Sequence, residues 1–179
     1  YVKVYEEERE LTVMLLVDVS GSSDFGAEGE MKRDMMAEIA ATLAFSAIEN
    51  NDKVGMILFS NKIEKFIPPK KGKKHILPVI STLLNFQPQN KGTDIRQALE
   101  FLTDGIKKRC TAFLVSDFID DSDYAHALSI ANNKHDLIAL QVYDKREMQL
   151  PDVGLVRVAD AETGAEKWVN TGAKKVREA

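Results

Sequence analysis

Short runs of apolar residues recur along the chain and alternate with longer stretches of helical character. Four such runs stand out, at 13–17, 54–59, 112–115 and 137–142. Continuous apolar runs of this length, bounded by polar or turn residues, are typical of strands buried on both faces of a parallel sheet. A fifth segment, 63–67, combines apolar ends with charged residues, as an edge strand does.

The stretches between these runs carry apolar residues at helical spacing. Two stripes follow this spacing: Ile95, Ala98, Leu99, Leu102 and Ile106, and Met36, Ile39, Ala40, Leu43 and Ala47. Weaker helical patterns cover 74–84 and 122–132. Strands that alternate with helices imply a sheet covered on both sides. The sequence therefore predicts a three-layer α/β fold with a doubly wound, mostly parallel sheet, whose core spans about 11–142.

The last thirty residues break this alternation. Residues 153–158 and 166–169 have the pattern of two strands around the turn Glu162–Gly164. They predict a C-terminal β-hairpin, within an extension of about 151–171. At 179 residues the whole chain, 1–179, is expected to form a single domain.

Composition narrows the class of protein. The chain has 24 Lys and Arg against 28 Asp and Glu, a net charge of −4, which argues against a dedicated nucleic-acid binder. A basic cluster at 70–75 leaves a local contact with phosphate or with an acidic partner open. The single cysteine, Cys110, cannot form an internal disulfide and suits a reducing compartment, so we expect a cytoplasmic protein.

The sequence also bears on the chain's context. No apolar run reaches the ~18 residues that span a membrane, so we expect no membrane segment here. The chain begins with Tyr1 and not with Met. We therefore expect it to be a domain excised from a longer protein.

Oxygen-bearing side chains follow the first predicted strand. Asp18, Ser20 and Ser22 are separated by single residues, a spacing that can point three oxygens at one spot. Carboxylate and hydroxyl oxygens are hard ligands that suit Mg²⁺ or Mn²⁺. Taken alone, the segment is equally well explained as a loop rich in turn-forming residues.

Two later segments favour the metal hypothesis. Gly92–Asp94 precedes a well-patterned helix, and Asp117 follows the predicted strand 112–115. Ligands bind at the carboxyl ends of the strands in doubly wound sheets. If the first strand and strand 112–115 are neighbours, Asp18 and Asp117 converge. Asp94 also has a structural explanation, as the N-cap of the helix.

In this order and on these strands, the residues resemble the metal-ion-dependent adhesion site of von Willebrand factor type A domains. That resemblance runs from about Leu11 to Val142. The ligands it implies are Asp18, Ser20, Ser22, Thr93 and Asp117, and the fold it implies is Rossmann-like. Four segments also resemble the prokaryotic domain-of-unknown-function family fifty-eight, whose members are typically encoded beside MoxR-type AAA+ ATPases. They are 7–11, 18–26, 92–95 and 115–118.

The resemblance implies a binding module and not an enzyme. A Mg²⁺ (or Mn²⁺) ion held by two carboxylates and neutral hydroxyls keeps a coordination position open to an Asp or Glu of a partner protein. That partner is expected to be a MoxR-type AAA+ ATPase or the client that it assembles or remodels.

Two other functions stay open. One is a metal-dependent phosphate-ester hydrolase. A haloacid dehalogenase-type phosphatase would need a second Asp where Ser20 stands, and no P-loop motif exists. The other is a nucleic-acid contact through 70–75, which the overall acidity makes the weaker option.

Overall fold

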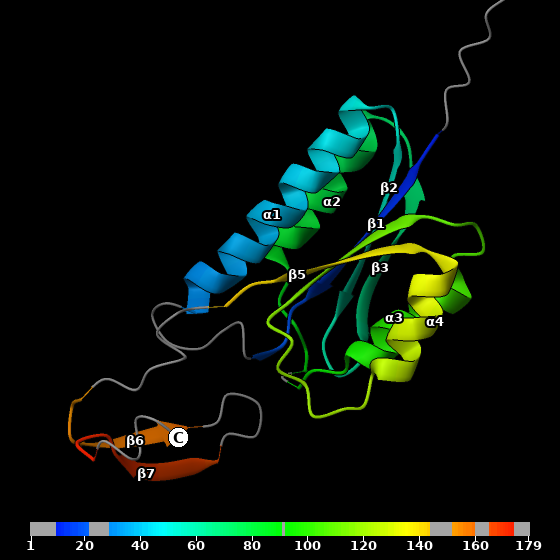
Figure 1. Ribbon diagram of the computed structural model, residues 1–179. Coiled ribbons are helices and arrows are strands. Elements are labelled where there is room, and N and C mark those ends of the chain that lie inside the picture. The colour runs from blue at the N-terminus through cyan, green and yellow to red at the C-terminus, as the bar shows by residue number, and fades with distance from the viewer. Residues whose placement is uncertain (1–9, 22–28, 91, 144–151, 160–164, 174–179) are drawn as a thin grey trace, which may run out of the picture.

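A five-stranded sheet forms the centre of the molecule in this computed structural model, which describes residues 10–21, 29–90, 92–143, 152–159 and 165–173 (Figure 1). The strands are β1 (Thr12–Asp18), β2 (Lys53–Phe59), β3 (Ile63–Lys70), β4 (Thr111–Ser116) and β5 (Asp136–Gln141), in the order β3-β2-β1-β4-β5. Only β3 runs antiparallel to its neighbour. The mostly parallel sheet is therefore confirmed, and so is the edge strand predicted at 63–67.

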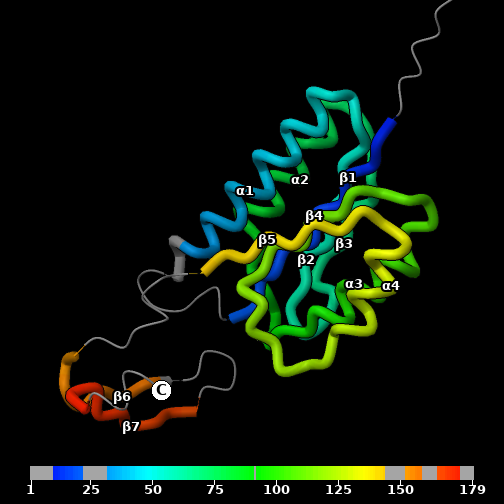
Figure 2. The backbone as a smooth tube through the Cα atoms, in the orientation of Figure 1, coloured from blue at the N-terminus to red at the C-terminus, as the bar shows by residue number. Residues whose placement is uncertain are grey.

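Four helices complete the three layers. They are α1 (Gly29–Glu49), α2 (Lys73–Asn85), α3 (Ile95–Gly105) and α4 (Ala125–Lys134). Figure 2 shows α1 and α2 side by side on one face of the sheet, with α3 and α4 on the other. In the part of the chain that the structure describes, no helix has both the length and the apolar character to cross a membrane. The predicted three-layer α/β architecture is confirmed.

The alternation of side chains along β1 explains why its sequence is apolar throughout. Leu15 and Val17 point into a core shared with α1 and α2, whereas Met14 and Leu16 point into a core shared with α3 and α4. Successive residues of a strand face opposite sides. Because helices cover both sides, both sets of side chains are buried and the run is continuous.

The prediction that 137–142 is buried on both faces is wrong. β5 is the last strand of the sheet, and most of its residues are partly or fully exposed. Ile138, for example, is 41% exposed. An apolar run indicates a strand that is at least partly covered, but the place of the strand in the sheet decides how much of it stays accessible. In the described ranges, β5 pairs with β4 alone.

The C-terminal hairpin is confirmed. β6 (Leu155–Ala159) and β7 (Glu166–Asn170) pair antiparallel as a two-stranded sheet of their own. The backbone N–H of Thr171 donates to the Gly154 carbonyl at 2.7 Å and closes the open end of the hairpin. The predicted turn at 162–164 lies outside the described residues. The single-domain organisation of the chain stays a prediction.

Candidate metal centre

The carboxyl ends of β1 and β4 bring two acidic side chains to one place. β1 pairs with β4 in parallel, with Val17 opposite Val115, so that Asp18 ends β1 beside the last residue of β4. Asp117 follows that residue directly. The condition set by the sequence, that these strands are neighbours, is met. Both carboxylates are buried, at 2% exposure for Asp18 and 3% for Asp117.

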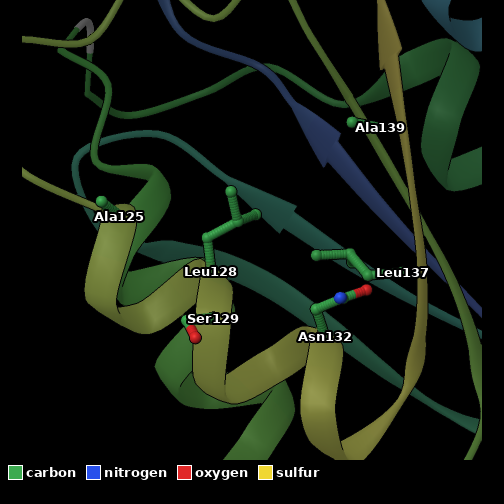
Figure 3. Close-up of a pocket in the computed structure, with 6 residues that line it drawn as sticks. All are labelled: Ala125, Leu128, Ser129, Asn132, Leu137 and Ala139. Carbon is green, nitrogen blue, oxygen red and sulfur yellow. The ribbon is translucent and has the colours of Figure 1, made fainter.

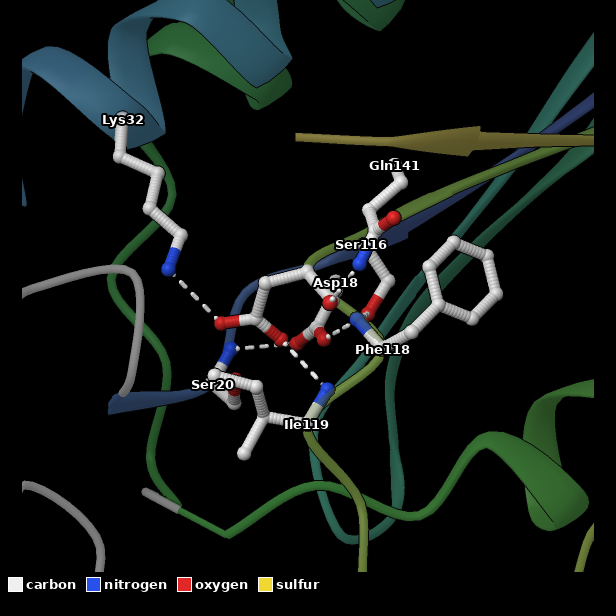
Figure 4. Close-up of polar contacts among 8 residues, drawn as sticks. Asp18, Ser20, Lys32, Ser116, Phe118, Ile119 and Gln141 are labelled. Carbon is white, nitrogen blue, oxygen red and sulfur yellow. Dashed lines mark hydrogen bonds and ion pairs between the residues drawn. The ribbon is translucent and has the colours of Figure 1, made fainter. Parts of the chain in front are cut away.

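Asp18 is held through both of its carboxylate oxygens (Figure 4). The Ser20 backbone N–H donates to Oδ1 at 2.9 Å, and the Ser116 hydroxyl donates to Oδ2 at 2.6 Å. Burial raises the pKa of Asp18 from 3.8 to about 6, and the charge of Asp117 acts in the same direction against these hydrogen bonds. The fold thus keeps a carboxylate where its negative charge is costly, as expected of a group that serves a cation.

Asp117 is held from three elements. The Lys32 ammonium, which reaches over from α1 in Figure 4, lies 2.8 Å from Asp117 Oδ2. The Ile119 backbone N–H donates to Oδ1 at 3.0 Å, and the Gln141 side-chain amide of β5 donates to the Asp117 carbonyl at 3.2 Å. The first two contacts fix the carboxylate, and the third fixes the backbone of Asp117 against β5.

The residue after Asp117 has an unusual backbone. Phe118 has a φ of 61°, in the left-handed region that bulky residues rarely adopt. Its N–H donates to the Ser116 hydroxyl oxygen at 3.0 Å, so the same hydroxyl serves both this turn and Asp18. Such a conformation costs on the order of 1–3 kcal/mol and concentrates at functional sites. The turn directs Asp117 toward Asp18 at the expense of local strain.

The loop that carries Thr93 is tied to the same end of the sheet. The Asp94 N–H donates to the carbonyl of Ser60, which directly follows β2, at 3.0 Å. The Ile95 N–H donates to Asp120, in the loop that follows Asp117, at 2.7 Å. Thr93 is half-buried next to these two anchors. The predicted N-cap is confirmed, since the Asp94 side chain accepts from the Gln97 N–H at 3.0 Å.

A second network stiffens this loop from β3. Glu64 accepts from the Ser60 hydroxyl at 2.8 Å and from the Asn90 side-chain amide at 2.7 Å. Asn90, which precedes the loop, and Ser60, which directly follows β2, therefore share one carboxylate. The approach to Thr93 is fixed by side chains of three separate segments.

Four of the five predicted ligands lie in the described residues. Asp18, Ser20 and Asp117 belong to one buried network, and Thr93 lies in the adjoining loop. Ser22 lies outside the described residues. The structure gathers these side chains at one end of the sheet, and their role as metal ligands stays a prediction.

Three contributors to this network were not among the predicted ligands. Ser116 and Gln141 end neighbouring strands, where polar side chains are expected at a ligand-binding edge. Lys32 carried a stronger signal. It stands four residues before Met36 and eight before Ala40, on the buried stripe of α1. A lysine on such a stripe needs an anionic partner.

The donor chemistry fits a hard divalent cation. Within the described ranges, no group of three or more His, Cys, Asp or Glu side chains could hold a metal. A cation at this end of the sheet would therefore depend on Asp18, Asp117 and neutral hydroxyl oxygens. Oxygen donors of this kind suit Mg²⁺ or Mn²⁺, which also retain water ligands.

A separate cavity lies between α4 and β5 (Figure 3). Its volume is about 330 Å³, and its lining residues are Ala125, Leu128, Ser129, Asn132, Leu137 and Ala139. These side chains are apolar or neutral. The cavity offers apolar contacts and neutral polar groups, and none of its lining residues is charged.

The family of the chain follows from comparison with known sequences. The model of DUF58, a family described as proteins of unknown function, matches residues 1–179. The chain belongs to the DUF58 family. Uncharacterized proteins of Mycobacterium tuberculosis and Mycobacterium bovis are each 30% identical to it over 159 residues. These matches cover 88% of the chain but 50% of each relative, so this DUF58 chain spans about half the length of the curated relatives it matches.

Solved structures identify the fold. An aerotolerance-related membrane protein of Bacteroides fragilis aligns with a TM-score of 0.61 at 18% identity, over 94% of this chain and 84% of that one. A von Willebrand factor type A protein of Catenulispora acidiphila aligns with a TM-score of 0.56 at 16% identity, over 73% of this chain and 32% of that one. The mussel byssus proximal thread matrix protein 1, whose metal-ion-dependent adhesion site (MIDAS) motif is occupied by zinc, aligns with a TM-score of 0.56 at 19% identity. The alignment covers 73% of this chain and 37% of that one. The DUF58 chain therefore has the von Willebrand factor type A fold.

Proposed function

We propose that the chain is a binding module in which a Mg²⁺ (or Mn²⁺) ion captures a carboxylate of a partner protein. The observation that carries the proposal is the pair of buried acids at one end of the sheet, Asp18 and Asp117, each held in place by hydrogen-bond donors. The residues that would hold the ion are Asp18, Ser20, Ser22, Thr93 and Asp117. When bound, the ion supplies an electrophilic centre that favours an anionic oxygen.

The contacts of the two acids favour binding over catalysis. Asp18 accepts hydrogen bonds at both oxygens, and Asp117 is engaged by Lys32 and by the Ile119 N–H. A general base needs a carboxylate within reach of the proton that it removes. Both carboxylates here are instead committed to contacts that fix their position. We propose that the protein is not an enzyme, and a metal-dependent phosphate-ester hydrolase is the less supported alternative.

The proposed partner is a MoxR-type AAA+ ATPase or a client protein that it assembles or remodels, in the cytoplasm. Membership of the DUF58 family supports this through the resemblance stated from the sequence, which implies a gene beside such an ATPase. The fold supports a metal-centred site, since the mussel byssus protein of the same fold holds zinc in its MIDAS motif. The carboxylate of the partner would be an Asp or a Glu.

The test is a titration of the protein with a MoxR-type AAA+ ATPase from the same organism, in Mg²⁺ and in chelator. Wild type should bind the ATPase in Mg²⁺ and should lose affinity by tens to thousands of fold in chelator. The reason is that removal of one partner of a buried charged contact often costs roughly 2–5 kcal/mol of binding free energy. Asp18→Ala should bind weakly in both conditions. Asp104→Ala is the matched control, because Asp104 is exposed near the other end of α3.

Thermal melts of the free protein show whether the metal itself binds. Mg²⁺ at a hundred times its dissociation constant should stabilise wild type by about 2.7 kcal/mol. Coincident melts in Mg²⁺ and in chelator would contradict the metal site, and equal binding of the ATPase in both conditions would place the interface elsewhere. Phosphate-ester turnover that survives repurification and disappears in Asp18→Asn would favour the hydrolase instead.

A further inference from the structure

A buried lysine lies at the proposed metal centre. The Lys32 side chain is 5% exposed, the Asp117 side chain is 1% exposed, and 2.8 Å separates Nζ from Oδ2. Transfer of both charges out of water is expensive, and an ion pair between them does not by itself make such burial favourable. Lys32 also stands in the first turn of α1, where the helix dipole disfavours a cation. Neither helix stability nor burial explains its position.

The charges around the site show what Lys32 changes. Without a metal, the ammonium of Lys32 offsets one of the two carboxylates, Asp18 and Asp117. A divalent cation beside these three described side chains brings their summed charge to +1. Without Lys32 the same cation would be balanced by the two described carboxylates. Among the described side chains, Lys32 therefore determines whether the loaded site sums to zero or to +1.

We propose that Lys32 is a built-in counter-cation of the metal centre. It compensates Asp117 while the metal is absent, holds down the affinity for a divalent cation, and makes the loaded site accept one carboxylate to reach neutrality. This inference rests on the proposed function, since it concerns the same site.

The arrangement couples the metal to the captured carboxylate. A carboxylate that neutralises the surplus charge strengthens metal binding, and by linkage the metal strengthens carboxylate binding by the same factor. Lys32 increases this coupling factor because its positive charge repels the metal. The captured carboxylate offsets that repulsion, so Lys32 weakens metal binding mainly when the carboxylate is absent. The free module would then hold its metal weakly and the complex would hold it firmly.

The experiment is a titration with Mn²⁺, followed by its electron paramagnetic resonance signal, on the full chain. Lys32→Met should bind Mn²⁺ more tightly than wild type by on the order of ten- to a hundredfold, as expected for removal of a unit charge a few ångströms from the ion. Lys32→Gln, which keeps a hydrogen-bond donor for Asp117, should show the same direction and serves if Lys32→Met does not fold.

Two controls separate the charge at the site from other effects. Lys32→Arg keeps the charge and should bind Mn²⁺ as wild type does. Lys53→Met removes one positive charge at the start of β2, where Lys53 is 42% exposed and pairs with Glu10. Because Lys53 pairs in register with Thr12, at the far end of β1 from Asp18, this variant should leave Mn²⁺ affinity unchanged.

Acetate provides the probe for coupling. Added acetate should tighten Mn²⁺ binding more in wild type than in Lys32→Gln. Equal enhancement in the two proteins would overturn the coupling of metal and carboxylate through Lys32.

The Mn²⁺ outcomes distinguish this inference from the proposed function. If Lys32→Met and Lys32→Gln bind Mn²⁺ and wild type does not, the result would support the role of Lys32 as a counter-cation most strongly. Equal or weaker Mn²⁺ binding by both uncharged variants, with wild type binding normally, would overturn the role of Lys32 and leave the metal site standing. Absence of Mn²⁺ binding from wild type and all variants would overturn both.

Discussion

The two ends of the β1–β4–β5 region bury polar groups in opposite ways. At the carboxyl end, Asp18, Asp117 and Lys32 are buried as charged groups. At the amino end, Cys110 and His135 are buried next to each other, with 3.2 Å between Cys110 Sγ and His135 Nδ1. The Cys110 N–H also donates to this ring nitrogen at 3.3 Å. Both ends therefore bury polar groups that contact one another, but the two ends differ in charge.

The pKa values make the difference explicit. Burial raises the pKa of the Cys110 thiol to about 11, and burial lowers the pKa of His135, so both stay neutral near pH 7. The amino end keeps its ion pair, between Arg109 and Asp136, on the surface. A fold avoids buried charge unless another requirement overrides the cost. Asp52 is also buried at the amino end of the sheet, where it accepts from the Leu11 N–H at 3.0 Å, but the carboxyl end buries two carboxylates and a lysine. This concentration of buried charge favours the carboxyl end as the functional one.

The largest effect should come from removing a charge at the carboxyl end. Asp117→Ala eliminates the carboxylate that Lys32 contacts and the acceptor for the Ile119 N–H. Breaking a buried pair in this way typically costs about 3–5 kcal/mol. Urea unfolding in chelator should show a loss of this size. The double variant Asp117→Ala with Lys32→Met should recover part of it, and a loss below about 1 kcal/mol would show that the pair is not desolvated as the structure indicates.

The second effect concerns the pH dependence of the metal-free protein. Because the folded state raises the pKa of Asp18 from 3.8 to about 6, it binds this proton more tightly than the unfolded chain does. The contribution of Asp18 to the free energy of unfolding is then full below about pH 4 and falls as the pH rises to about 6. The total fall is about 3 kcal/mol, at 1.36 kcal/mol per pKa unit.

Asp18→Asn removes this proton equilibrium. The variant should be more stable than wild type at pH 7 in chelator and should lose the stabilisation by Mg²⁺. Urea unfolding from pH 4 to pH 7 measures the difference between the two proteins. Parallel pH profiles, or a variant less stable at pH 7, would contradict the burial of a charged Asp18.

The smallest effect should come from the amino end. Cys110→Ala removes a small buried neutral side chain and should cost about 1 kcal/mol. It should leave Mn²⁺ affinity unchanged. Because its thiol is buried and its pKa is raised, Cys110 in wild type should react with a thiol reagent only as fast as the protein opens. Fast labelling of folded protein at pH 8 would show that this end is not closed.

Much of the fold could be predicted because its signals are local. The apolar run at 13–17, the stripe on the helix at 95–106 and the cap at Asp94 each depend on neighbours in sequence. The exposure of β5 could not be predicted this way, since it depends on which strand lies beside it. The contact of Lys32 with Asp117 could not be predicted from local sequence, because the two residues lie 85 positions apart in the chain.

By itself, the sequence determined which oxygen donors this protein has, the order in which they occur, and the strand or helix end at which each stands. Only the tertiary structure decided that β1 and β4 are neighbours, that Ser116 bonds Asp18, and that Lys32 reaches Asp117. The reason is electrostatic. The energy of a charge depends on the water removed around it and on the charges brought near it, and segments far apart in the chain set both of these.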